Sequence, residues 1–404
     1  MQYVNVFKGL ESGEKYIVFG MLLVFILGGF GDLPPLFGLI FMTVGIIKVI
    51  MNKGYQEIRV TPLTRPLILI LLIAVFSLIN IISLRSAFNM LGTMLEIVLG
   101  FFITYYIFKN KSEQFHQKML FFLFLGGTIT ALYGVYEGIF IDPRRLQSVI
   151  GNSNLLGVYM MFFVFLVLIL FYKKNYKLWT AGSILFLLFG YNLLYALSLS
   201  AVVGTILGFF FFFVLKSKKL LLVFIIMLML SPLILPEPLT GRMESAYDKT
   251  RAGNYQRPYV YQSAYEMFAN NLVLGVGIGH FREYYPDYLD PEAPNQSRVY
   301  NHTHNIFLQF MSELGLAGLL AFLYLIIMIV KTVYKALPFA PDFKGNLCLL
   351  FTSAFFGFFF QEQTEFSLIS SAIAVLVGIL LGWWMALLTD QQKKKETKQQ
   401  SVID

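Results

Sequence analysis

The chain has 404 residues, of which 57% are hydrophobic and only 13% are charged, and its formal net charge is +8. Ordinary soluble domains have about 25% charged residues, so this composition excludes a soluble globular protein. In a membrane protein a positive net charge reflects first where the basic residues lie, and it does not indicate a nucleic-acid partner.

Apolar runs of about twenty residues recur along the chain, and each is long enough to cross a hydrocarbon core of about 30 Å as a helix. We therefore predict an all-α polytopic membrane protein with about twelve transmembrane helices. The first run is expected to be retained, because no small-residue cleavage site follows it. The predicted spans are 16–31, 33–51, 65–84, 90–108, 117–140, 154–172, 178–195, 197–215, 218–235, 305–330, 347–361 and 366–388.

The spacing of the spans divides the chain into four parts. One long segment between the ninth and tenth spans has no apolar run, which predicts a single large extracytoplasmic loop domain. The parts are helices 1–9 in residues 1–235, the loop domain in 236–304, helices 10–12 in 305–388 and a cytoplasmic tail in 389–404.

Two features organise the predicted loop domain. Tyr261, Tyr265 and Phe268 recur at helical intervals within 257–270, which predicts an amphipathic helix lying on the membrane surface. Three alternating glycines then follow in 275–279. Outside a strand-turn-helix unit they do not indicate a dinucleotide site, and we interpret them as a turn that lets the backbone approach the membrane helices.

The basic residues alternate between the two sides of the predicted bundle. If the N-terminus is cytoplasmic, 22 of the 31 basic residues fall in the cytoplasmic segments. The positive-inside rule then predicts that both termini are cytoplasmic and that the loop domain is outside.

Arginine dominates the basic residues left on the outer side. A guanidinium grips a phosphate with two parallel hydrogen bonds, so this sorting indicates an anionic ligand on the outer face. The alternative, that each arginine pairs with a carboxylate of the same loop, remains open. The outer basic residues are Arg85, Arg144, Arg145, Arg242, Lys249, Arg251, Arg257, Arg282 and Arg298.

The candidate catalytic residue lies where the loop domain meets the tenth span. His304 and Asn305 directly precede this apolar run. The positive end of a helix attracts an anion and disfavours protonation of an imidazole, which suits a general base. A capping or hydrogen-bonding role for His304 is the alternative. Metal binding by His302 and His304 is not expected, because no third ligand is evident in the sequence.

These residues also carry a resemblance to a known family. His304-Asn305, nine residues, then Gly315-Leu-Ala-Gly318 resembles the signature of the O-antigen ligase and polymerase superfamily, membrane glycosyltransferases with a Wzy-C type domain. The segments 270–277 and 151–154 and the position of Arg257 resemble further family features in the same order.

The resemblance implies a GT-C-like helical fold in a bacterial cytoplasmic membrane. It implies transfer of a glycan from an undecaprenyl-diphosphate-linked donor to a glycan or lipid acceptor on the outer face, among membrane lipids and with no metal or other cofactor. His304 would activate the acceptor hydroxyl, and Arg257 would hold the pyrophosphate. Asn305 and Glu313, which belong to the family-like stretch, are candidates for supporting the site, and His302 is a further candidate that the signature does not include.

One position departs from the family pattern. Many members have an arginine where this chain has Ala201, so one expected phosphate ligand is missing. We expect Arg144 or Arg145 to substitute for it. Gly315 and Gly318 are expected to be close-packing residues within a membrane helix.

Two other functions compete with glycan transfer. A transporter or lipid-linked-glycan flippase also has about twelve spans, but it should place charges and broken helices near the midplane in matching halves. A metal-dependent membrane glycosyltransferase needs acidic ligands in the first outer loop, where only Asp32 is available.

Overall fold

The computed structural model describes residues 6–53, 60–142, 144–231, 240, 241, 244 and 252–403. Three of the outer basic residues, Arg242, Lys249 and Arg251, lie outside these ranges. The described residues form helices and no strand. Nine of their helices are long and apolar enough to cross a membrane. The chain is therefore an all-helical membrane protein, as predicted.

A helix coincides with each of the twelve predicted spans, but three of these helices are too short, whereas α6, with 14 residues, reaches 19 through the 3-10 turn that continues it to Phe171. α1, α3 and α9 have 16, 13 and 13 residues, so the described residues do not confirm a count of twelve spans. The helices are α1 (Ser12–Leu27), α2 (Leu33–Lys53), α3 (Thr64–Phe76), α4 (Leu84–Phe108), α5 (Glu113–Phe140), α6 (Ser153–Leu166), α7 (Tyr176–Tyr195), α8 (Leu199–Lys216), α9 (Lys218–Leu230), α11 (Ala252–Asn270), α12 (Phe281–Tyr284), α13 (Ile306–Ala336), α14 (Phe343–Gln361) and α15 (Ser371–Ile403). Short 3-10 turns are η2 (Ser77–Asn80), η3 (Ser148–Ile150), η4 (Val167–Phe171), η6 (Tyr285–Tyr288) and η7 (Ser367–Ile369).

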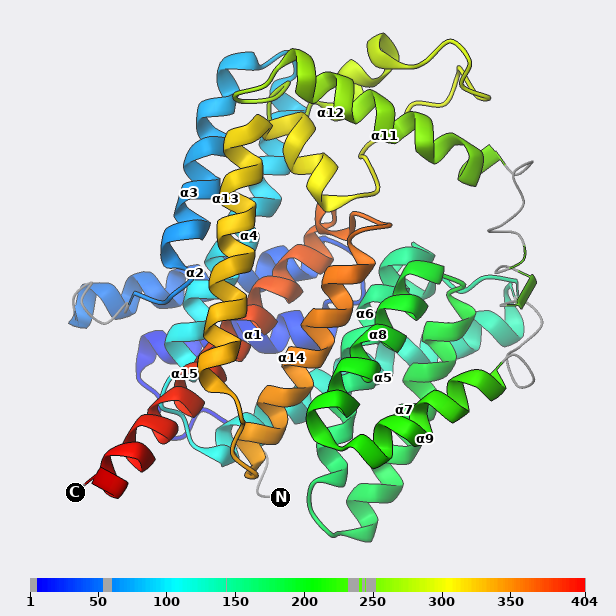
Figure 1. Cartoon of the computed structure of the whole chain (residues 1–404). Helices are drawn as coiled ribbons and strands as arrows, with labels where there is room; N and C mark the ends of the chain where they lie inside the picture. The colour runs from blue at the N-terminus through cyan, green and yellow to red at the C-terminus, as the bar shows by residue number, and fades with distance from the viewer. Residues whose placement is uncertain are drawn as a thin grey trace.

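Contacts between loops group the segments as the basic residues predict. The segments expected in the cytoplasm contact one another through ion pairs at one end of the bundle, which we call the lysine end. The opposite end carries α11 and α12, and we call it the loop end (Figure 1). The ion pairs are Lys53–Glu11, Lys111–Glu14, Lys173–Glu113, Lys344–Asp390 and Lys394–Asp342.

The C-terminal segment is part of the fold. α15 continues without a break to Ile403, whereas the sequence suggested a separate solvated tail from residue 389. Gln391 Oε1 accepts a hydrogen bond from Ala340 N–H at 2.9 Å, and Lys395 Nζ donates to Leu337 O at 2.6 Å. The part of α15 from Gln391 to Lys395 therefore packs against the connection between α13 and α14.

α13 folds back on itself at Gly315, which corrects the predicted tenth span. Gly315 has φ 63° and ψ −158°, a conformation open to glycine and incompatible with a continuing helix. Phe310 and Phe322 stack with ring centroids 4.5 Å apart, although twelve residues of straight helix would separate them by about 18 Å. Gly315 is thus the turn of a helical hairpin, not only a packing residue in one helix, and Figure 1 shows the change of direction.

The three alternating glycines hold this turn in place. Gly275, Gly277 and Gly279 all have positive φ, and a side chain on Gly275 would collide with the α13 backbone at Ser312 and Glu313. Val276 N–H donates to Ser312 O at 2.9 Å, and on the far side of the turn Leu316 N–H donates to Leu272 O at 2.8 Å. The predicted close approach of this segment to a membrane helix is confirmed.

The loop domain has a small core of its own. α11 buries Val260, Ala264 and Met267 against Phe281 and Tyr285. One face of this helix therefore packs into the loop domain itself. The helix predicted over 257–270 is therefore present and begins five residues earlier, at Ala252.

A buried histidine fastens this domain to the helices below it. His280 Nε2 accepts hydrogen bonds from the N–H groups of Ile82 and Ser83, in the connection between α3 and α4, at 3.1 and 2.9 Å. α11 is thereby held across the loop end, above the ends of α6 and α14 (Figure 1).

Candidate functional site

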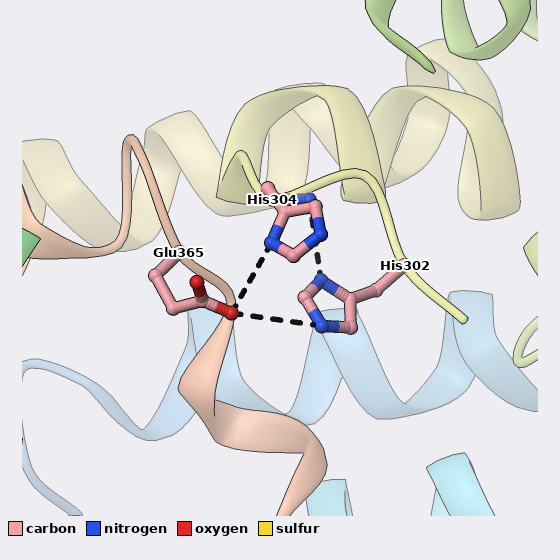
Figure 2. Close-up of side chains that lie close together, drawn as sticks. All are labelled: His302, His304 and Glu365. Atoms are coloured by element: carbon pink, nitrogen blue, oxygen red, sulfur yellow. Dashed lines mark hydrogen bonds and ion pairs between the residues drawn. The ribbon is translucent and has the colours of Figure 1, made fainter. Parts of the chain in front are cut away.

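Two histidines and a glutamate meet under α11 at the loop end. His304 Nδ1 lies 3.2 Å from Glu365 Oε1, and His302 Nε2 lies 3.7 Å from the same oxygen (Figure 2). The histidines precede α13, and Glu365 lies between α14 and α15. The side chains of His302, His304 and Glu365 are 14%, 18% and 9% exposed, so the cluster is shielded yet reachable from the loop end.

The backbone at His304 is held in an uncommon conformation. Its φ is +56°, a region in which few residues other than glycine are found. The flanking residues fix it there: Thr303 N–H donates to Gln309 Oε1 at 2.9 Å, and Asn305 caps α13 by accepting from Leu308 N–H at 3.1 Å. Such strain persists where surrounding contacts enforce it, and it is concentrated at functional sites.

The hydrogen bonds give the two histidines different roles. An ionised carboxylate only accepts hydrogen bonds, so His304 donates to Glu365 from Nδ1 and its Nε2 retains a lone pair. His302 Nδ1 instead accepts from the backbone N–H of His304 at 3.2 Å, which leaves the proton on its Nε2. Burial, followed by the neighbouring His304, lowers the pKa of His302 to about 4. His304 is therefore the one of the two that can accept a proton from a substrate.

The same hydrogen bonds do not suit a metal ion. One ligand atom from each of the three residues lies within 4.8 Å of the others, so Glu365 supplies the third ligand that the sequence did not reveal. A histidine that binds a metal normally donates its other ring N–H to an acceptor. In His302 that other nitrogen faces a donor, so its Nε2 carries a proton and no free lone pair.

Glu365 connects the histidines with Arg257 of α11. Arg257 Nη2 lies 3.9 Å from Glu365 Oε2, and its side chain is 35% exposed. Burial alone would raise the pKa of the Glu365 carboxyl, but the hydrogen bond that His304 donates and the positive charge of Arg257 oppose burial, and this pKa is lowered below its ordinary value. Glu365 is therefore ionised at neutral pH.

The adjacent arginines Arg144 and Arg145 have different contacts. Arg145 Nη2 donates to Asn154 Oδ1 at 2.8 Å, and Asn154 Nδ2 donates to Glu365 Oε2 at 2.9 Å. Arg145 Nε also donates to Ala196 O at 3.1 Å, near the start of α8, the helix that contains Ala201. Arg144 is 87% exposed and pairs with Asp142 at 2.9 Å. Only Arg145 is linked to the histidine cluster.

The predicted supporting residues lie around the start of α13. Asn305 Nδ2 also donates to Gln363 O at 3.0 Å, and Ile306 N–H donates to Glu362 O at 2.9 Å, so the helix start is tied to the segment that carries Glu365. The N–H groups of Ile306 and Leu308, at the start of α13, are thus already hydrogen-bonded within the protein and are not free to bind an anion. Glu313 accepts from Phe281 N–H at 3.1 Å and is hydrogen-bonded to Gln309, the residue that holds Thr303.

The first outer loop has a structural role. Asp32 Oδ1 accepts hydrogen bonds from Ser370 Oγ at 2.9 Å and Ala372 N–H at 2.8 Å, at the start of α15. Asp32 therefore caps a helix, which weakens the metal-dependent alternative.

Two residues of the cluster were not predicted from the sequence, namely Glu365 and Asn154. Glu365 belongs to the polar segment 361–365 between two apolar runs, on the side predicted to be outside. Asn154 lies within the 151–154 segment that carried part of the resemblance, where Asn152 is the residue that caps α6.

A comparison with protein families matches residues 183–323 to the family described as O-antigen ligase, Wzy_C. The match covers α8, α11 and the turn of α13 and includes Arg257, His302 and His304. Arg145, Asn154 and Glu365 lie outside it. No curated protein matches the chain.

Proposed function

We propose, from the match of residues 183–323 to the O-antigen ligase family, that the chain transfers a glycan from an undecaprenyl-diphosphate-linked donor to a hydroxyl acceptor. The reaction would take place at the loop end, on the outer face of a bacterial cytoplasmic membrane. The observation that carries the proposal is the pair of His304 and Glu365 beside Arg257. Glu365 orients His304, the candidate base, and also contacts Arg257, a cation suited to binding a phosphate.

His304 would act as the general base. Its Nε2 accepts the proton of the acceptor hydroxyl while that oxygen bonds to the anomeric carbon of the donor glycan. The bond from this carbon to the pyrophosphate oxygen breaks, and undecaprenyl diphosphate leaves with the bonding electron pair. Glu365 keeps the Nδ1 proton in place and stabilises the imidazolium that forms, as the third member of a catalytic triad does.

Arg257 and Arg145 would stabilise the leaving group. Negative charge increases on the pyrophosphate as the bond breaks, so guanidinium groups aimed at it favour the transition state. Arg257 pairs with Glu365 at 3.9 Å, a long contact for an ion pair, and a pyrophosphate offers it a bidentate partner instead. Arg145 would fill the role of the arginine absent at Ala201. No metal ion is needed for this charge balance.

A flippase is the second candidate, because α13 is broken. Discontinuous helices near a binding site are typical of transporters. The two functions differ in their products. A transferase releases undecaprenyl diphosphate, whereas a flippase moves the intact donor between leaflets.

We expect the purified protein, given a synthetic undecaprenyl-diphosphate-linked oligosaccharide, to release undecaprenyl diphosphate and to form a longer or acceptor-linked glycan. The reaction should be run with donor alone and with an added lipid acceptor, and the products separated by mass. Movement of donor across vesicle bilayers without release of undecaprenyl diphosphate would contradict transfer and establish the flippase.

The two adjacent arginines provide a matched test of the anion-binding role. Arg145→Ala is expected to weaken donor binding about 10- to 100-fold, the range for losing a hydrogen bond between charged groups. Arg144→Ala should bind donor as the unaltered protein does, because Arg144 is exposed and pairs with Asp142. Equal effects of the two substitutions on donor affinity would remove Arg145 from the site.

A further inference from the structure

A cavity of about 800 Å³ lies at the lysine end, far from the histidine cluster. It is lined by the last residues of α8 and α13, the connection between α13 and α14, the first turns of α14 and the C-terminal part of α15. The cavity begins at the last turn of α13, whereas the histidine cluster precedes the first turn of that helix, and none of the cluster residues lines the cavity. The cavity therefore has no part in the transfer reaction proposed above.

The lining of the cavity is positively charged. Lys216, Lys335 and Lys395 line it together with a single carboxylate, that of Glu396. Lys216 Nζ donates to the Asn346 amide at 2.6 Å. Among the described residues, none of the three lysines has a carboxylate oxygen within the 4.0 Å that defines an ion pair. Lys395 Nζ donates to Leu337 O at 2.6 Å. These neutral acceptors do not cancel the positive charges, so an anionic ligand would meet a net positive charge in the cavity.

Apolar side chains line the rest of the cavity and continue from it along the helices. Leu215, Tyr334 and Leu349 lie in its wall. On α13, Val330 and Ile327 follow the cavity toward the middle of the helix, and they are 59% and 49% exposed. A ligand here would meet cations at the helix ends and apolar surface along the span.

We propose that this cavity binds the headgroup of an anionic phospholipid, whose acyl chains lie along the exposed faces of α8 and α13. Basic pockets between membrane helices on the lysine-rich side bind such headgroups, and each lysine near the surface contributes about 1 kcal/mol. The bound lipid would brace the ends of α8 and α13 against α15, where no helix of the described residues fills the space.

The test uses the full-length protein in nanodiscs, with phosphatidylglycerol as the probe and phosphatidylcholine as the neutral reference. We expect native mass spectrometry to show retained phosphatidylglycerol on the unaltered protein, and the melting temperature to be higher in phosphatidylglycerol. Lys216→Gln with Lys335→Gln should lower phosphatidylglycerol affinity roughly 10- to 30-fold and abolish that rise. In phosphatidylcholine, this double variant and the control variant described next must have the melting temperature of the unaltered protein.

Lys174→Gln with Lys177→Gln is the matched control, since these exposed lysines are predicted to lie on the same side but do not line the cavity. This control should keep the bound lipid. The proposal is overturned if the cavity variant retains as much phosphatidylglycerol as the control. It is also overturned if glycerol phosphate or inorganic phosphate alone stabilises the protein to the same extent, because the site would then bind a free anion.

Discussion

Replacing His304 with alanine is expected to lower the rate of glycan transfer about 10²- to 10⁴-fold, the range that general-base assistance supplies. Donor binding should persist, because Arg257 and Arg145 do not depend on the imidazole for their positions. The measurement is release of undecaprenyl diphosphate at saturating donor, together with donor affinity by titration. Turnover close to that of the unaltered protein would exclude His304 from the mechanism.

His302 is the control for this prediction. His302→Ala should reduce transfer no more than about tenfold, because its Nδ1 only accepts the His304 backbone N–H, and one such hydrogen bond contributes about 1 kcal/mol. A chelator should leave transfer unchanged in the unaltered protein. Strong inhibition by the chelator, reversed by a divalent cation, would instead make His302, His304 and Glu365 ligands of a metal.

The sequence predicts the helices well because the bilayer imposes their length. A helix that crosses about 30 Å of hydrocarbon needs about twenty apolar residues, and such runs are evident without any tertiary contact. The hairpin at Gly315 escapes this reasoning, because Ser312 and Glu313 interrupt the apolar residues only briefly before the turn, and the apolar run continues on both sides of them. Only contacts between distant residues reveal it, such as the stacking of Phe310 on Phe322 and the hydrogen bonds from the segment around Gly275.

The candidate site was predicted in part, and the reason differs from residue to residue. His304 and Arg257 stand in recognisable surroundings, beside an apolar run and within an arginine-rich loop. Glu365 is 61 residues beyond His304 in the chain, and the fold alone brings the two side chains together.

Arg144 and Arg145 show the limit of reasoning from residue type. They have the same charge and adjacent positions, so the sequence cannot rank them. Local geometry separates them: Asp142 holds Arg144 in solvent, while the end of α7 and Asn154 hold Arg145 toward the cluster.

Glu365→Gln is expected to lower the maximal rate of transfer about 100-fold or more without weakening donor binding. The amide removes the charge that stabilises the imidazolium of His304, and it also releases Arg257 from a carboxylate that competes with pyrophosphate. The lowered pKa of Glu365 shows that its partners favour the ionised carboxylate. Its contribution to the stability of the folded protein is therefore complete above the ordinary pKa and is lost as the pH falls through the lowered pKa. Glutamine imitates the uncharged form at every pH.

A purely structural carboxylate would give a different result, with donor affinity and rate falling together and the melting temperature dropping. The deciding measurement is therefore the pair of donor affinity and maximal rate in one preparation, with Glu365→Asp as the variant that keeps the charge and should recover part of the rate.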